Sequence, residues 1–350
     1  MIPISVCIIT KNESPKLNKC LSHIKDFPFE IVVVDTGSTD DSIDIARQYT
    51  DKIFYFDWIS DFSAARNFSI SKASHDWILV LDTDEYVEEI DLPALYQLID
   101  CYPNGLGCIM RYSPNTKGSI MHENVPRLFN RNIYHYVRPV HEQIYPFEGY
   151  PMQLFSVPLS CQHDGYIGTP EELKEKSMRD LQILIDNLDH YKDGYSYYQI
   201  AQSYYMMGDS KNAMAYYEKA FDYDLNPNAD YTKLMVINYG YCLKEFGRID
   251  DALNLYAQLA PYFDYIADFV YLYGLLYMEK KEYLQAAVYF IKASTLETFF
   301  IEGTNTFLPC HLIGIIYHAL GNDDIARMYL EKCGNYQPAL DKLAELEASN

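Results

Sequence analysis

Small residues recur at a fixed offset in the second half of the chain. In each of four units a second small residue follows the first twelve positions later, the pairs being Ala201/Ala213, Gly240/Ala252, Gly274/Ala286 and Gly314/Ala326. Four positions after each second member stands a bulky residue: Tyr217, Tyr256, Phe290 or Leu330. Small residues let two helices pack closely, and stacked units bury a continuous core. The recurrence therefore predicts a stack of helix pairs, with an irregular helical bundle as the alternative.

These landmarks resemble those of the tetratricopeptide repeat. Successive units begin 39, 34 and 40 residues apart, so two of them carry additional loop residues. We expect about four repeats over residues 194–335 and a C-terminal helix over residues 336–350. Of the 34 tyrosines, 23 fall at or after Tyr191. They either line a concave surface suited to a peptide or protein, or simply fill the bulky positions of the repeat.

The first half of the chain alternates apolar strands with helices. The runs ISVCIIT, EIVVVD, KIFYF and WILVLD are separated by segments of helical character such as FSAARNFSISKA. This alternation predicts an α/β domain with a mostly parallel, Rossmann-like sheet over residues 1–168. The pattern ends where TPEELKEK predicts a helix with Thr169 as N-cap, Pro170 at the first position and Glu172 in a capping box. We assign residues 169–193 to this linking helix.

The charge balance narrows the class of partner. A formal net charge of −21 argues against binding nucleic acid or anionic lipid over a broad surface, because such partners need a basic footprint. No apolar run approaches the ~20 residues of a membrane span, and PISVCIIT lacks the basic leader of a signal peptide. The eight cysteines form no CxxC pair, which indicates reduced, mostly buried thiols. We therefore expect a cytoplasmic protein without a transmembrane segment.

Polar residues stand where the expected strands end. Thr10 and Lys11 follow ISVCII, Asp35 ends EIVVVD, and Asp82 and Asp84 follow WILVL. The carboxyl ends of parallel strands share one edge of a sheet, where ligands collect. Side chains two residues apart in an extended chain point the same way, so the two aspartates should converge and need a positive charge. Neither the dinucleotide glycine fingerprint nor a P-loop occurs, which disfavours those two kinds of site.

Taken in order, SVCIITKNES, EIVVVDTGSTDDS, DFSAARNFSI and WILVLDTDEY resemble the nucleotide-sugar domain of the family 2 glycosyltransferases, which have the inverting GT-A fold. The resemblance covers roughly residues 3–168 and implies a uridine diphosphate (UDP) sugar bound at the strand edge. It implies that Asp35 and Thr10 meet the uracil and that Asp82 meets the ribose. Asp84 would hold a divalent metal ion that bridges the diphosphate.

A nucleoside diphosphate leaving group needs its developing negative charge stabilised. Lys11 and Arg66 are the candidate cations at the same edge, although Arg66 would alternatively be a helix-surface arginine. Asn67, the next residue in the AARN motif, is assigned to the donor site with them.

An acceptor hydroxyl or thiol must lose a proton as it attacks, so the reaction needs a base. The segment YHYVRPVHEQIYP resembles the VHE motif of bacterial members of the family and assigns Glu142 as the base, with His141 as the alternative. His163 in CQHDGYIG resembles the histidine of an HxGY segment and would close the metal site with Asp84, or else be a hydrogen-bonded loop histidine. Imidazole ligation favours Mn²⁺ over Mg²⁺.

A GT-A domain followed by repeats is most similar to the sublancin-type bacteriocin S-glycosyltransferases. The resemblance implies transfer of a hexose from a UDP-hexose to a Cys or Ser/Thr side chain of a peptide or protein. The repeats would help to bind this acceptor. The other role expected for the repeats is to join two copies of the chain in a homodimer. The chain begins directly at its first expected strand, so the acceptor does not carry over. The alternatives are a glycosyltransferase of lipopolysaccharide or another cell-envelope glycan, and a non-catalytic repeat scaffold, against which the joint presence of Asp82, Asp84, Glu142 and His163 argues.

Overall fold

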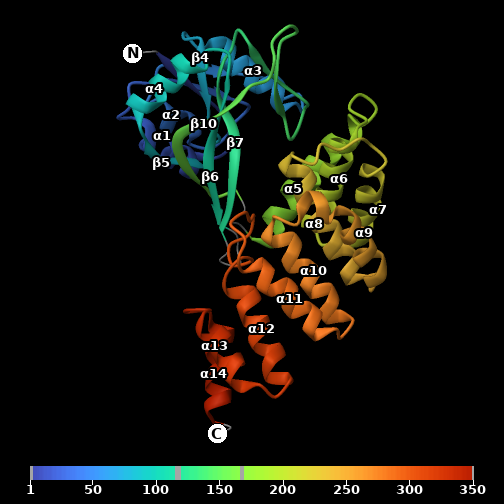
Figure 1. Cartoon of the computed structure of the whole chain (residues 1–350). Coiled ribbons are helices and arrows are strands. Elements are labelled where there is room, and N and C mark those ends of the chain that lie inside the picture. Colours follow the sequence, from blue (N-terminus) through green and yellow to red (C-terminus); the bar gives the residue numbers. More distant parts are fainter. Residues whose placement is uncertain (1–2, 115–119, 166–168, 349–350) are drawn as a thin grey trace. The chain divides into compact units, whose positions relative to one another are not determined.

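The chain folds into an α/β unit followed by an all-helical unit (Figure 1). The computed structural model describes residues 3–114, 120–165 and 169–348, and it divides into Met1–Tyr191 and Lys192–Asn350. The first unit contains a curled, mostly parallel sheet with helices, and the second contains paired helices. The predicted fold class is confirmed.

An eight-stranded sheet forms the centre of the first unit among the described residues. Its strands, in spatial order, are β3 (Ile53–Tyr55), β2 (Glu30–Asp35), β1 (Ile4–Thr10), β4 (Trp77–Val80), β7 (Ile120–Asn130), β6 (Leu106–Pro114), β10 (Leu154–His163) and β5 (Glu85–Ile90). The first four are parallel to one another, whereas β7 and β5 run antiparallel to their neighbours. A separate two-stranded sheet pairs β8 (Tyr134–Val137) with β9 (Gln143–Pro146).

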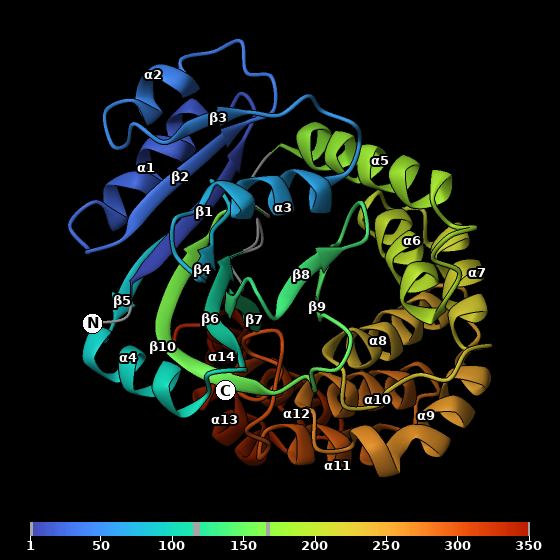
Figure 2. The same ribbon diagram turned by 90° about the horizontal axis from the view of Figure 1, so that it is seen from above.

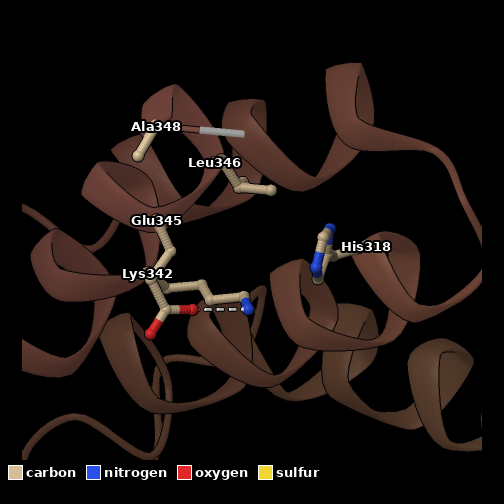
Figure 3. A pocket seen from close by; sticks show the side chains of 5 residues that line it. All are labelled: His318, Lys342, Glu345, Leu346 and Ala348. Carbon is tan, nitrogen blue, oxygen red and sulfur yellow. Dashed lines mark hydrogen bonds and ion pairs between the residues drawn. The ribbon is translucent and has the colours of Figure 1, made fainter. Parts of the chain in front are cut away.

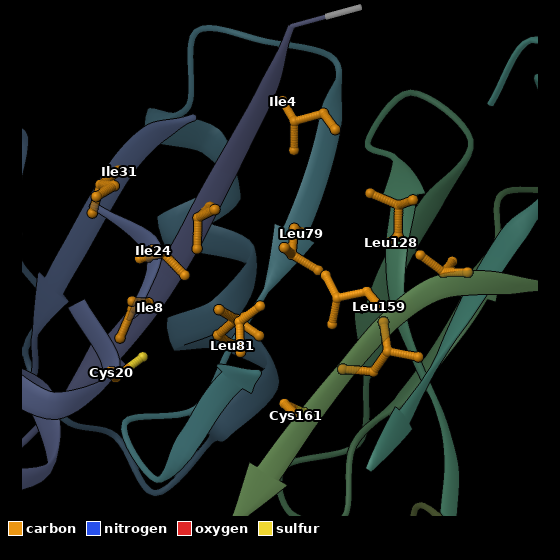
Figure 4. Packing of buried hydrophobic residues seen from close by; sticks show 14 of the residues in the cluster. Ile4, Ile8, Cys20, Ile24, Ile31, Leu79, Leu81, Leu128, Leu159 and Cys161 are labelled. Carbon is orange, nitrogen blue, oxygen red and sulfur yellow. The ribbon is translucent and has the colours of Figure 1, made fainter. Parts of the chain in front are cut away.

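Helices cover both faces of the large sheet (Figure 2). On one side lie α1 (Ser14–Ile24), α2 (Ser42–Ala46) and α4 (Leu92–Cys101), and on the other lies α3 (Phe62–Lys72). Residues of β1 alternate between the two cores. Ile4 and Ile8 pack with Ile24 of α1 (Figure 4), whereas Cys7 packs with Ile70 of α3. Burial on both faces explains why the central strands are almost continuously apolar.

One helix begins later than its sequence indicates. The segment DTGSTDDS predicts a turn at Gly37, where φ is indeed +106°, and a helix start at Ser38 to Asp40, but α2 begins at Ser42. Asp35 accepts a hydrogen bond from Ser38 N at 3.1 Å. Asp40 likewise accepts one from Ser42 N at 3.0 Å. Because these side chains bind the backbone donors of the turn, they compete with a helix there, and the expected start is wrong.

The helix after the sheet begins as expected. α5 (Pro170–Asp186) has Thr169 as its N-cap, and the Thr169 side chain accepts a hydrogen bond from Glu172 N at 3.2 Å. The Glu172 carboxylate in turn accepts from Thr169 N at 2.8 Å. The predicted capping box is confirmed.

Paired helices make up the second unit. In chain order its helices are α6 (Gly194–Met206), α7 (Ser210–Ala220), α8 (Asp230–Glu245), α9 (Ile249–Phe263), α10 (Ala267–Glu279), α11 (Tyr283–Ala293), α12 (Phe307–Ala319), α13 (Asp323–Glu331) and α14 (Gln337–Ala348). α14 lies in the expected C-terminal helix, whose residues 349–350 fall outside the described residues.

The recurring small residues lie where the two helices of a pair approach each other. A Cβ added at the glycine would stand only 2.3 to 2.6 Å from the nearest side-chain atom of the bulky partner in three pairs: Gly240/Tyr256, Gly274/Phe290 and Gly314/Leu330. Each partner is the bulky residue of the same unit in the sequence pattern. The close helix packing that the pattern predicts is confirmed.

In the longest repeat unit, a buried carboxylate accepts hydrogen bonds from the backbone of the additional loop. Between α11 and α12 lies a loop over residues 294–306. Asp268, in the first turn of α10, accepts hydrogen bonds from Phe300 N at 2.9 Å and from Ile301 N at 3.2 Å. Burial raises the pKa of Asp268 to about 6. The loop is therefore fixed to the preceding helix pair.

The cysteines are free thiols. Six of the eight are buried, and burial raises the pKa of Cys7 and of Cys161 to about 12. This confirms the reduced, mostly buried thiols expected from the sequence. Within the described residues, no helix combines the length and the apolar character needed to cross a membrane.

Candidate active site

The carboxyl ends of β1 and β2 lie side by side, because Thr10 pairs with Asp35 in their register. The Asp35 carboxylate accepts a hydrogen bond from Gly37 N at 3.0 Å and so shapes its own turn. The Thr10 hydroxyl is buried and has no partner among the described residues. Lys11, the next residue, is exposed. The structure therefore brings Thr10 and Asp35 together, and the Thr10 hydroxyl has no hydrogen-bond partner among the described residues.

Asp82 holds two arginines. Its Oδ1 accepts from Arg66 Nη2 at 2.6 Å, and its Oδ2 accepts from Arg127 Nη2 at 2.7 Å. Burial alone would raise the pKa of Asp82, but the charges of Arg66 and Arg127 outweigh it and hold the pKa well below its usual range. Asp82 is therefore an ionised anchor for two cations.

Buried and partly buried charges of alternating sign extend from Asp82 in both directions. We call this series the charge chain, and its members in order are Glu142, Arg66, Asp82, Arg127, Glu85, Arg111 and Glu123. The contacts of Asp82, Glu85 and Glu123 with their arginines have N···O distances of 2.6 to 3.2 Å. A buried charge is costly unless it is paired, and alternation pairs every member.

Sequence reasoning does not single out four members of the charge chain: Glu85, Arg111, Glu123 and Arg127. Glu85 begins β5, Arg111 lies in β6 and Arg127 lies in β7, each beside apolar residues. A charged residue inside an apolar strand must find a partner when the strand is buried, and this is the signal that points to them. This signal does not identify the partner of each charged residue, because the partner comes from a different segment of the chain.

Asp84 and His163 form a second pair at the same edge. His163 Nε2 lies 3.7 Å from Asp84 Oδ1. Burial, followed by the charge of Asp82, raises the pKa of Asp84. Burial, followed by the charge of Arg111, lowers the pKa of His163 to about 4. His163 is therefore a neutral imidazole near pH 7, with nitrogen lone-pair density available to a ligand.

Ser113 orients the His163 ring. The Ser113 hydroxyl donates to Glu123 at 3.0 Å and lies 3.0 Å from His163 Nδ1. Because its proton is directed to Glu123, the hydroxyl accepts a hydrogen bond from Nδ1–H. The unprotonated Nε2 then faces Asp84. The charge chain therefore ends next to the Asp84–His163 pair.

Gly165 leaves a space between these two side chains. A Cβ at Gly165 would lie 2.2 Å from His163 Nε2 and 3.1 Å from Asp84 Oδ2, so a larger residue would fill the space that both atoms face. A carboxylate oxygen and a neutral imidazole nitrogen suit a divalent ion, manganese better than magnesium. The described residues include no cluster of three or more His, Cys, Asp or Glu side chains arranged for a metal. Asp84 and His163 thus offer two side chains whose chemistry fits a divalent ion.

Glu142 and His141 lie in the loop between β8 and β9. Arg138 and His141 have φ values of +76° and +49°, a conformation uncommon outside glycine that concentrates at functional sites. Glu142 Oε1 accepts from Arg66 Nε, and no described residue donates to its other oxygen. Burial lowers the pKa of His141, against the charges of Asp180 and Glu142. The loop therefore places Glu142 next to Arg66, and His141 precedes Glu142 in the chain.

Asn67 holds the strand that leads into this loop. Its Nδ2 donates to Tyr136 O at 2.9 Å, and its Oδ1 accepts from Tyr136 N at 3.0 Å. Adjacent residues of α3 thus position β8 through Asn67 and Glu142 through Arg66. A ligand contact by Asn67 stays a prediction.

Five buried polar atoms of the first unit have no hydrogen-bond partner in the described part of the chain: Thr10 Oγ1, Arg66 Nη1, Arg127 Nε, His135 Nδ1 and Tyr136 Oη. The Arg66 guanidinium lies 5.4 Å from the centre of the Tyr136 ring. Buried polar atoms are nearly always hydrogen-bonded in folded proteins. Two of these atoms belong to Arg66 and Arg127, which contact Asp82, so donors without a partner among the described residues lie at this edge.

A pocket in the second unit lacks such features (Figure 3). It is lined by His318, Lys342, Glu345, Leu346 and Ala348. Lys342 and Glu345 pair with each other at 2.8 Å, one turn apart on α14. The pocket contains none of the residues of the charge chain, all of which belong to the first unit. We therefore assign no chemistry to it.

Comparison with known families separates the same two parts of the chain. Residues 5–157 match the family described as Glycosyl transferase family 2. Residues 194–227 and 309–339 match the tetratricopeptide repeat.

Three curated relatives match parts of the chain. A TPR repeat-containing protein of Synechococcus elongatus is 38% identical over 148 residues, which cover 41% of this chain and 36% of the relative. The SPbeta prophage-derived glycosyltransferase SunS of Bacillus subtilis is 29% identical over 188 residues, 52% of this chain and 44% of the relative. An uncharacterized glycosyltransferase of Rickettsia felis is 38% identical over 85 residues, 24% of this chain and 30% of the relative. The chain thus spans less than half the length of the curated relatives it matches.

Proposed function

We propose that this chain, which carries a glycosyl transferase family 2 domain followed by tetratricopeptide repeats, is a metal-dependent glycosyltransferase. Both resemblances seen in the sequence motifs are confirmed by the family matches. Relatives named as glycosyltransferases support the activity. Its donor is a UDP-hexose, its metal is Mn²⁺, and it inverts the anomeric centre on transfer.

The observation that carries this proposal is the Asp84–His163 pair with the space left by Gly165. The pair supplies one carboxylate oxygen and one neutral imidazole nitrogen, 3.7 Å apart. A metal ion held there would supply positive charge to the diphosphate of the donor. An acidic chain without a P-loop needs such a charge to bind a diphosphate.

The remaining residues of the edge bind the nucleoside. The unpartnered Thr10 hydroxyl and the Asp35 carboxylate, adjacent in the sheet, contact the uracil in this proposal. Asp82 meets the ribose while it holds Arg66 and Arg127, because a carboxylate oxygen can accept more than one hydrogen bond. Lys11 follows Thr10 in the motif SVCIITKNES, and Asn67 follows Arg66 in the motif DFSAARNFSI. These two residues complete the donor site in this proposal.

Transfer then needs one proton acceptor. The acceptor sulfur or oxygen attacks the anomeric carbon of the hexose while Glu142 takes its proton. The bond from the anomeric carbon to the diphosphate oxygen breaks, and its electron pair leaves with UDP. Arg66 orients Glu142 through Nε and leaves one carboxylate oxygen for the proton. His141 is the alternative base.

The acceptor is the side chain of a Cys, Ser or Thr in a peptide or protein. This assignment rests on the order of the two domains, which is similar to that of the sublancin-type enzymes. The repeats bind the acceptor or join two copies of the chain. A cell-envelope glycan is the alternative acceptor, and transfer of radiolabelled hexose to peptides, proteins and purified glycans in parallel would distinguish the classes.

The proposal is tested by the metal dependence of UDP-glucose hydrolysis. The parent protein should release glucose from UDP-glucose in the presence of Mn²⁺, and this hydrolysis should stop in excess EDTA. Asp84→Ala should abolish hydrolysis without unfolding, because Asp84 lies at the rim and belongs to neither core. Asp164→Ala is the matched control, since this nearby carboxylate binds Lys19 at 3.3 Å and Gln162 at 2.8 Å instead. Full activity of the Asp84→Ala protein would refute the metal assignment.

A further inference from the structure

The arginines of the charge chain are committed to carboxylates. Arg66, Arg111 and Arg127 each contact two of them. Guanidiniums neutralised in this way add little net positive charge at the place where a diphosphate would lie. A donor bound near Asp84 therefore calls for a further cation that is not already paired.

Lys176 of α5 lies next to the Asp84–His163 pair, and no carboxylate of the described residues forms an ion pair with it. Its Nζ donates to Gly165 O at 3.5 Å, and Gly165 is the residue whose missing side chain opens the space between Asp84 and His163. Within the described residues Lys176 takes part in no ion pair, and its side chain is exposed. The ammonium is thus available to a ligand in that space.

Two other lysines near this edge are already engaged, whereas Lys11 stands exposed after the end of β1. Lys16 pairs with Glu13 at 3.1 Å, and Lys19 pairs with Asp164 at 3.3 Å. The charge of Lys176 also reaches several groups of the site. Burial and other charges have larger effects on the pKa values of Asp84, His163 and His141. The charge of Lys176 contributes as well and lowers the pKa of each. Lys176 therefore lies within electrostatic range of both the metal pair and the candidate bases.

We propose that Lys176 binds the diphosphate of the sugar donor and stabilises it as it leaves. This inference rests on the proposed glycosyltransferase function and adds a substrate-binding residue to it. As the bond between the anomeric carbon and the diphosphate oxygen breaks, the electron pair goes to that oxygen. The Lys176 ammonium pairs with the resulting negative charge and keeps its proton, while Glu142 holds the proton of the acceptor. The role is electrostatic, so an arginine can replace the lysine but a neutral side chain cannot.

Binding of UDP and of uridine isolates this role, because the two probes share the nucleoside and differ in the diphosphate. We expect Lys176→Gln in the full chain to weaken UDP binding about tenfold in isothermal titration with Mn²⁺, and to leave uridine binding unchanged. A loss of that size is usual for a hydrogen bond between charged groups. Lys176→Arg should restore UDP binding to near the parent value.

Lys174→Gln is the matched control. Lys174 is also exposed and lies two residues earlier on the same helix, so its side chain points roughly 200° away around the helix axis. This variant removes the same charge from the chain and should bind UDP like the parent.

The possible outcomes separate the inference from the function beneath it. If the parent binds UDP and Lys176→Gln binds it equally well, Lys176 has no role at the diphosphate. Equal losses for UDP and uridine would show a structural effect and also overturn the inference. A parent that binds neither probe would overturn the proposed function itself, and the assignment of Lys176 with it.

Discussion

Asp82 and Asp84 are two residues apart, but their surroundings shift the pKa values of the two carboxyls in opposite directions. Arg66 and Arg127 lower the pKa of Asp82, whereas burial and the neighbouring Asp82 raise that of Asp84. Opposite shifts in neighbouring carboxylates mark a division of roles. Asp82 anchors the arginines, and Asp84 faces His163. The positive charge that the motif requires is therefore supplied to Asp82 by two guanidiniums, and the metal assignment concerns Asp84.

At the residue scale, Glu142→Gln tests the base. Glutamine keeps an oxygen for the hydrogen bond from Arg66 Nε but cannot take up the acceptor proton. We expect hexose transfer to fall by ~10²-fold or more while UDP affinity stays nearly constant, because a general base acts in the transition state. Initial rates of transfer and UDP titrations on the same preparations measure both quantities.

His141→Gln is the companion variant for this experiment. His141 precedes Glu142 in the same loop and has a lowered pKa, so it is neutral and competent as a base near pH 7. It should retain transfer if Glu142 is the base. An inactive His141→Gln protein beside an active Glu142→Gln protein would exchange the two roles.

At the scale of elements, the helix pairs depend on glycines that face large side chains. A Cβ on Gly274 would lie 2.6 Å from Phe290 Cε1. Gly274→Ala should gain up to ~1 kcal/mol of helix propensity but lose ~1–3 kcal/mol to overpacking. We expect a net loss of stability, visible as a lower urea midpoint by circular dichroism.

Phe290→Leu added to Gly274→Ala tests whether the loss comes from this contact. Leucine already fills the equivalent place opposite Gly314, at Leu330. The double variant should be more stable than the sum of the two single changes predicts. Additive effects, or a Gly274→Ala protein as stable as the parent, would show that the glycine is not required for packing.

At the scale of the whole molecule, each unit has its own core. Two apolar clusters lie within residues 4–161, and two others lie within residues 271–346. Units with separate cores are able to fold independently. The proposed chemistry uses residues of the first unit alone, whereas the proposed acceptor binding uses the second.

A fragment of residues 1–191 tests this division of labour. It should fold, as judged by circular dichroism, and should hydrolyse UDP-glucose at a rate close to that of the full chain. Transfer to a peptide acceptor should be lost, because the repeats proposed to bind the acceptor are missing. Size-exclusion chromatography of both forms should accompany the assay. Transfer retained together with a loss of self-association would assign the repeats to a homodimer instead.

The sequence by itself determined the features that depend on residues close together in the chain. Strand runs, the Thr169 capping box and the spacing from Gly274 to Phe290 are set by local periodicity. The strand-end positions of Thr10, Asp35 and Asp82 follow from the same runs. Family motifs then gave these positions their proposed roles.

Only the tertiary structure decided which charges meet. Arg127 lies 45 residues from Asp82 in the chain and reaches it because β7 pairs antiparallel with β4. Lys176 reaches Gly165 because α5 turns back towards the end of β10. The order of strands in a sheet and the return of a helix depend on the packing of the whole core, which no local pattern encodes. The charge chain and the lysine beside it are therefore properties of the fold.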